Sequence, residues 1–110
     1  MSTSTSAPPK LSSRQKKFLK GLGHGLTANI LIGKEGITER LIAATDLELT
    51  RHELVKVRIG TNSSEEKHAA SEHLSTATGS ALVQLLGKTM LLFRQSPDLP
   101  DDKKLVLPIG

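Results

Sequence analysis

The chain has 110 residues, of which 36% are hydrophobic, so it is long enough for one domain built on one hydrophobic core. It contains no cysteine, and this excludes disulfide bonds, zinc sites with thiolate ligands and a cysteine nucleophile. The formal net charge of +4 and the lack of any apolar run of membrane-spanning length lead us to expect a cytoplasmic protein with a polyanionic partner and no membrane contact.

Residues 1–10 are rich in Ser, Thr and Pro, a composition typical of a disordered tail, and we place the folded domain at residues 11–108. Ser12 and Gln15 have the spacing of a capping box, which predicts that a helix begins here. We expect this helix to end in a glycine-rich stretch that contains Gly21, Gly23 and Gly25.

This first helix is predicted to be amphipathic. The stripe that should face the core consists of Leu11, Gln15, Phe18, Leu19 and Leu22. The opposite face is basic and consists of Arg14, Lys16, Lys17 and Lys20. Because no acidic residue lies among these cations, the basic face is compatible with polyanion contact as well as with ordinary solvation.

A short apolar run, Ile30–Ile32, predicts a buried strand, and the loop Gly33–Gly36 follows it directly. Glycines allow positive φ and a close approach of the backbone to a ligand. A helix is predicted from Glu39 to about Arg51, and its unpaired first N–H groups and dipole favour an anion. A Gly-x-x-Gly pattern arises by chance in a glycine-rich chain, so an ordinary strand-to-helix turn also remains open.

Within this loop, Lys34 has an ammonium group that could reach a backbone phosphate. The neighbouring Glu35 would repel a phosphate, so its side chain is expected to point away. The helix after the loop should turn four residues inward: Ile37, Leu41, Ala44 and Leu49.

The segment Leu54–Ile59 alternates with period two, which predicts a strand with a buried face and with Lys56 and Arg58 on the opposite face. Glu53, just before this strand, is expected to be a junction residue that bridges to a nearby cation. A second capping box, Ser63–Glu66, should begin a third helix that stops at Gly79.

Two apolar runs, Ala81–Leu86 and Thr89–Arg94, flank Gly87 and Lys88 and predict a tight hairpin. These strands are the most hydrophobic, so we expect them to be central. Leu105–Leu107 is a candidate short edge strand. The order of elements predicts an α+β fold of two layers, in the order αβαβαββ, with a mixed sheet of about four strands.

Neither a metal site nor catalysis has support in the sequence. Glu65, His68 and Glu72 share one helical face, but it should be open to water, so we expect no metal or other cofactor. The serines have tail or capping roles, which leaves no candidate nucleophile and predicts a protein that is not an enzyme. With two Phe, both assigned to the core, and no Tyr or Trp, the chain lacks an aromatic platform for stacking bases.

Four segments together resemble the CRM domain, and in particular its stand-alone bacterial YhbY-type members. They are Lys20–His24, Leu31–Thr38, His52–Arg58 and Thr78–Thr89. The resemblance implies an RNA-binding domain similar to the C-terminal domain of bacterial translation initiation factor 3, and association with precursors of the large ribosomal subunit. This sequence departs from the family pattern at Ala28, where relatives often have proline, and at Phe93, where tyrosine is frequent.

Our hypothesis is a non-enzymatic protein, monomeric when free, that docks on structured ribosomal RNA. The predicted RNA-binding residues are the loop residues Gly33, Lys34, Glu35 and Gly36 and the helix residues Arg14, Lys16, Lys17 and Lys20, with Lys56, Arg58 and Lys88 as further contacts. The alternative is a protein-interaction module of ribosome assembly whose attraction to RNA is only nonspecific.

Overall fold

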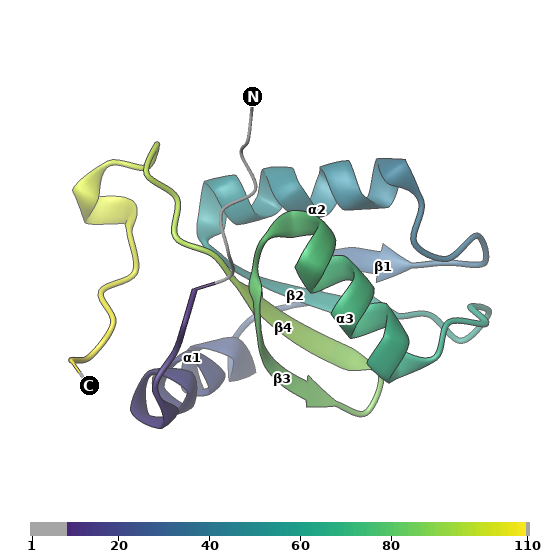
Figure 1. Ribbon diagram of the computed structural model, residues 1–110, viewed down its shortest axis with the longest axis horizontal. Coiled ribbons are helices and arrows are strands. Elements are labelled where there is room, and N and C mark those ends of the chain that lie inside the picture. The colour runs from purple at the N-terminus through teal and green to yellow at the C-terminus, as the bar shows by residue number, and fades with distance from the viewer. Residues whose placement is uncertain (1–8, 110) are drawn as a thin grey trace.

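The computed structural model describes residues 9–109 and contains three helices and one four-stranded mixed sheet (Figure 1). The helices are α1 (Ser13–His24), α2 (Glu39–His52) and α3 (Lys67–Thr78), and the strands are β1 (Ile30–Ile32), β2 (Leu54–Ile59), β3 (Ala81–Leu86) and β4 (Thr89–Phe93). This confirms the predicted α+β class and the order of elements. The predicted tail falls mainly on residues 1–8, outside the described residues. Within the described range, every helix is too short or too polar to cross a membrane.

The strands lie in the order β1-β2-β4-β3, with β1 parallel to β2 and the other two pairs antiparallel. The prediction that both hairpin strands are central was therefore wrong for β3, which forms an edge. In β4, the four residues Met90–Phe93 are all buried, so this strand is covered on both faces. In β3, Leu86 is 66% exposed. After α3 the chain forms the edge strand β3, and the hairpin then places β4 between β3 and β2.

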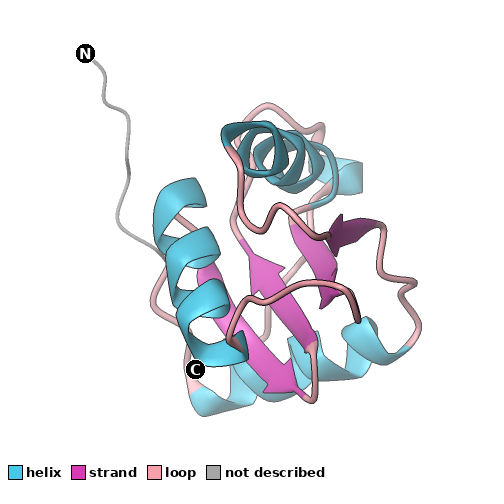
Figure 2. Cartoon of the chain, turned by 90° about the vertical axis from the view of Figure 1, so that its right-hand side faces the viewer, coloured by secondary structure: helices cyan, strands magenta, loops and turns pink. Residues whose placement is uncertain are grey.

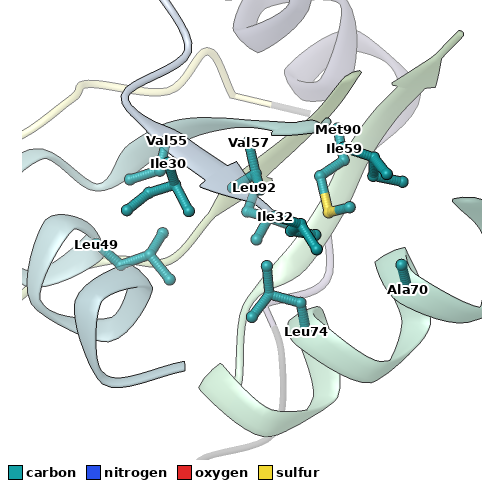
Figure 3. Packing of buried hydrophobic residues seen from close by; sticks show 10 residues of the cluster. All are labelled: Ile30, Ile32, Leu49, Val55, Val57, Ile59, Ala70, Leu74, Met90 and Leu92. Carbon is teal, nitrogen blue, oxygen red and sulfur yellow. The ribbon is translucent and has the colours of Figure 1, made fainter. Parts of the chain in front are cut away.

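Helices cover both faces of the sheet, which differs from the two layers that we expected (Figure 2). The larger core cluster lies between the sheet and the helices α2 and α3 (Figure 3), and includes Ile30, Ile32, Leu49, Val55, Val57, Ile59, Ala70, Leu74, Met90 and Leu92. The smaller cluster, on the face covered by α1, consists of Leu19, Leu54, Val83, Leu91 and Phe93. Alternation along β2 and β4 supplies both clusters from the same two strands.

Helix α1 begins at the predicted capping box but ends later than expected. The hydroxyl of Ser12 accepts from the Gln15 N–H at 3.1 Å, and the Gln15 side chain accepts from the Ser12 N–H at 3.0 Å. The C-cap is Gly25, so the other two glycines lie inside the helix. Gly23 packs so closely against Leu91 that a Cβ there would collide with the leucine side chain.

The inward stripes of α1 and α2 also differ from the prediction. Phe18 and Leu22 are 38% and 39% exposed, because α1 meets the sheet chiefly through Leu19 and Gly23. In α2, Ala44 is exposed and Thr45 is buried in its place. Burial of this threonine is tolerated because its hydroxyl donates to the Leu41 carbonyl at 2.8 Å.

Helix α3 ends at Gly79 as predicted, in the left-handed conformation, but it is capped differently at its start. Glu66 itself is the N-cap, and its carboxylate accepts from the N–H groups of His68 at 2.9 Å and Ala69 at 3.1 Å. These hydrogen bonds, first of all the one from the His68 backbone, lower the pKa of Glu66 to about 2. The carboxylate therefore stays charged, and the cap intact, far into the acid range.

Glu53 is buried and holds the C-terminal segment (residues 95–109) against the domain. Its carboxylate accepts from the N–H groups of Ser96 and Leu105, each at 2.7 Å. Its backbone has a φ of 65°, which turns the chain from α2 into β2. The expected bridge to a cation was wrong, and so was the edge strand at 105–107: this stretch has no strand pairing, and Leu105 and Leu107 instead pack against the smaller cluster.

We predict that Glu53→Ala lowers the free energy of unfolding by about 1–3 kcal/mol, because two buried N–H groups lose a charged acceptor. Urea unfolding gives the loss, and hydrogen exchange should show faster exchange of the Leu105 amide. Glu72→Ala is the control, since the Glu72 side chain is exposed. An unchanged exchange rate at Leu105 would contradict the anchoring role.

Candidate functional site

The loop Gly33–Gly36 is a tight turn at the carboxyl end of β1. The Gly36 N–H donates to the Gly33 carbonyl at 3.0 Å, so Lys34 and Glu35 occupy the two corners of the turn. Both side chains are exposed. The loop projects at the right of Figure 1, beyond the end of the sheet, where a large ligand can approach it.

The two glycines of this loop are needed for different reasons. Gly36 has a φ of 74°, and a Cβ there would overlap the carboxylate of Glu65, which comes from the loop after β2. Gly33 does not have a positive φ, and a Cβ there would meet nothing within 4 Å. The fold therefore requires a glycine at position 36, whereas only contact with a ligand would require one at position 33.

The N-terminus of α2 is partly capped by its own residues. The Thr38 hydroxyl accepts from the Leu41 N–H at 3.1 Å, and Glu39 occupies the first turn. Of the first three N–H groups of the helix, those of Glu39 and Arg40 remain for a ligand. The start of α2 therefore offers an anion fewer free N–H groups than the sequence suggested.

A groove of about 550 Å³ lies between β1 and the first turns of α2, and we call it the loop groove. It is lined by Asn29, Ile30, Leu31, Gly33, Lys34, Glu35, Gly36, Thr38, Arg40, Leu41 and Ala44. Arg40 was not among the predicted site residues. The signal that could have found it is its position in the first helical turn after the loop, on the same side as Lys34.

Three of the predicted contacts gather at the loop end of the sheet. Arg58 pairs with Leu31 of β1 on one side and with Thr89 of β4 on the other. The hairpin residue Lys88 lies beside the end of β2, because its carbonyl accepts from the Ile59 N–H at 2.7 Å. The side chains of Lys34, Arg58 and Lys88 are all exposed, so they form a cationic end of the molecule.

The predicted α1 contacts lie elsewhere. Arg14, Lys16 and Lys17 are exposed and Lys20 is half-buried. The start of α1 is held near the C-terminal segment, where the Gln15 amide donates to the Pro108 carbonyl at 2.9 Å. In Figure 1 it lies at the opposite side from the loop. The end of the same helix lies nearer the hairpin, since Gly23 and His24 line a small cavity with Leu86 and Thr89.

Lys56 has a structural role that the sequence did not reveal. Its ammonium group donates to the carbonyls of Gly23 at 3.1 Å and Leu26 at 3.3 Å, just where α1 ends. A cation at a helix C-terminus satisfies unpaired carbonyls and complements the dipole. This ammonium group is therefore engaged within the domain, unlike that of Lys34.

The histidine and carboxylate residues do not build a metal centre in the part of the chain that the structure describes. His68 lies 2.8 Å from the Glu66 carboxylate on the exposed surface of α3. Across residues 9–109, no three His, Asp or Glu side chains converge closely enough to hold a metal ion.

Comparison with known proteins shows the family of the chain. The family model of the CRS1/YhbY (CRM) domain matches residues 11–94. This range includes the loop, the whole sheet and the cations of α1, β2 and the hairpin. The chain belongs to this family. A CRM relative in Haemophilus influenzae, named RNA-binding protein, is 36% identical over 98 residues, which cover 89% of this chain and 95% of the relative.

Two further proteins extend the comparison. The Probable RNA-binding protein YqeI of Bacillus subtilis is 34% identical over 98 residues, covering 89% of this CRM protein and 99% of the relative. The solution structure of a hypothetical protein from Staphylococcus aureus has a TM-score of 0.73 and 35% identity, and the match covers 90% of this chain and 100% of that one. The likeness thus extends over nearly the whole folded domain.

We predict that Gly36→Ala lowers the free energy of unfolding by about 1–3 kcal/mol, because alanine is strained at a positive φ and its Cβ displaces Glu65. Gly33→Ala is the matched control and should change stability by no more than about 0.5 kcal/mol. Urea unfolding of both variants measures the difference. Equal losses of stability in the two variants would show that the fold does not need a glycine more at position 36 than at position 33.

Proposed function

We propose that this CRM protein binds RNA through the loop Gly33–Gly36 and its basic surface, docks on structured ribosomal RNA and assists assembly of the large ribosomal subunit. The observation that carries the proposal is the exposed turn at the end of β1, where Gly33, at which a Cβ would meet nothing within 4 Å, stands beside the exposed Lys34. The relatives named as RNA-binding proteins support the choice of RNA as the polyanion.

At the loop, a backbone phosphate would lie against Gly33, whose missing Cβ lets the chain approach closely, and Lys34 would neutralise its charge. Glu35, at the other corner of the turn, would point away from the phosphate. Such contacts fix position and carry little sequence information. The shape of the RNA would therefore supply most of the selectivity.

The cations lie in two groups, one on α1 and one at the loop end of the sheet. This arrangement favours a folded RNA as the partner. Arg58 pairs with Leu31 of β1 and Lys88 lies beside the end of β2, whereas the start of α1 lies toward the other side of the domain. A folded RNA presents phosphates in several directions and can contact both groups at once. Aromatic stacking does not contribute at the loop, since Phe93 is buried and Phe18 belongs to α1.

A protein-interaction module is the second candidate, and one surface favours it. Leu22 and Leu26, 39% and 38% exposed, line a groove of about 370 Å³ with Leu54 and Leu105, and Asn29 lines both this groove and the loop groove. Binding through this groove would be insensitive to salt and would be lost on changing its apolar residues.

We predict that Lys34→Ala weakens RNA binding to a similar degree for all sequences and lowers the slope of log affinity against log salt by about one unit. Gly33→Ala should also weaken binding without a loss of stability. Lys103→Ala, which removes an exposed lysine of the C-terminal segment, is the matched control. If Lys34→Ala and Lys103→Ala gave the same affinity and salt slope, Lys34 would not belong to the site.

The assembly role calls for a measurement in cells. We expect ultraviolet crosslinking, purification and sequencing of the attached RNA to give reads concentrated at a few places in large-subunit ribosomal RNA. Dispersed reads, together with a partner protein that stays bound at high salt, would favour the protein-interaction module instead.

A further inference from the structure

We infer that the loop groove binds an unpaired segment of the RNA, with a base lying on its apolar floor and the edge of that base hydrogen-bonded to the backbone of Leu31. This inference rests on the proposed function, because it assumes that the loop holds the phosphate next to that base. It goes beyond that function by naming the form of RNA that the groove accepts.

The free edge of β1 provides the hydrogen-bonding groups. β1 is the outer strand of the sheet and pairs only with β2. The Ile32 carbonyl accepts from the Gly60 N–H at 2.8 Å, so the polar groups of Ile32 face β2. Because these groups alternate along a parallel strand, the N–H and C=O of Leu31 face outward, into the loop groove.

The length of β1 argues against a peptide in this groove. A peptide strand that extends a sheet needs a row of outward-facing N–H and C=O groups. β1 has only three residues, so Leu31 is the one whose two groups both face the free edge. One donor beside one acceptor matches the edge of a single base, which carries both kinds of group in one plane.

The floor of the groove is formed by small and apolar side chains of α2. Ala44 is exposed there, one turn after the half-buried Leu41, while Thr45 and Leu49 take the buried positions below. The short Ala44 side chain leaves space above the helix. A base has an apolar face that suits such a floor, and a volume of about 550 Å³ lies within the range of small-ligand sites.

The rim of the groove is cationic. Lys34 and Arg40 line it, and Glu35 is the single acidic residue among its lining residues. This balance favours an anionic ligand, and Lys34 lies where the phosphate beside the bound base would be. A base in a duplex already has its pairing edge occupied, so the groove should accept only unpaired nucleotides, such as those of a bulge or a loop.

Two adjacent alanines of α2 provide the test. Ala43 and Ala44 are both exposed, but only Ala44 lines the groove. Ala44→Gln should fill the space without changing the net charge, and Ala43→Gln is the matched control for helix propensity and side-chain size. The probes are a short unstructured oligoribonucleotide and an RNA hairpin with a fully paired stem and a minimal loop, with affinities measured by fluorescence anisotropy.

We predict that Ala44→Gln weakens binding of the unstructured oligoribonucleotide by about tenfold, which corresponds to about 1.4 kcal/mol. It should leave the affinity for the paired hairpin unchanged, because paired bases cannot enter the groove, and Ala43→Gln should change neither affinity. Hydrogen exchange adds a direct readout: the outward-facing Leu31 amide should exchange fast in the free protein and slowly once the oligoribonucleotide is bound.

The outcomes separate this inference from the proposed function. If Lys34→Ala weakens binding but the two glutamine variants behave alike, or the Leu31 amide gains no protection, the groove does not hold a base although the loop still binds RNA. If neither probe binds, or if Lys34→Ala binds RNA with the same affinity as Lys103→Ala, the proposed function itself is wrong.

Discussion

The burial of β4 on both faces, with β2 beside it contributing to both core clusters, is the constraint on which the rest of this structure depends. Their alternating side chains contribute to two separate core clusters. One face of the sheet is therefore covered by α2 and α3, and the other by α1 and the C-terminal segment. With β4 in the centre, β1 and β3 become edges. The loop after β1 therefore sits at the open rim of the sheet, next to a strand with one free side.

Polar groups from distant parts of the chain hold these layers together. The buried Glu53 carboxylate binds two N–H groups of the C-terminal segment, and Lys56 closes the end of α1. Arg94 connects two helices through hydrogen bonds to the Thr50 hydroxyl of α2 and the Thr78 carbonyl of α3. These contacts occupy Glu53, Lys56 and Arg94 inside the domain, whereas the cations at the start of α1, in the loop and in the hairpin are exposed.

The candidate site combines a rigid part and an exposed part. The positive φ of Gly36 and its hydrogen bond to the Gly33 carbonyl set the shape of the turn, while the Lys34 side chain is exposed. A groove with a free strand edge then continues from the turn along α2. Phosphate contact at the turn and base contact in the groove would use different chemical groups, and so they can be tested with different substitutions.

The sequence by itself determined what depends on near neighbours: the period of each element, the capping box at Ser12, the stop at Gly79 and the turn with Lys34 at its corner. Tertiary structure decided what depends on residues far apart in the chain: that β3 is an edge, that Ala44 opens a groove while Thr45 is buried, and that Glu53 and Lys56 are structural. The physical reason is that periodicity and capping act within a few residues, whereas strand order and the partner of a charged group are chosen by packing across the whole domain.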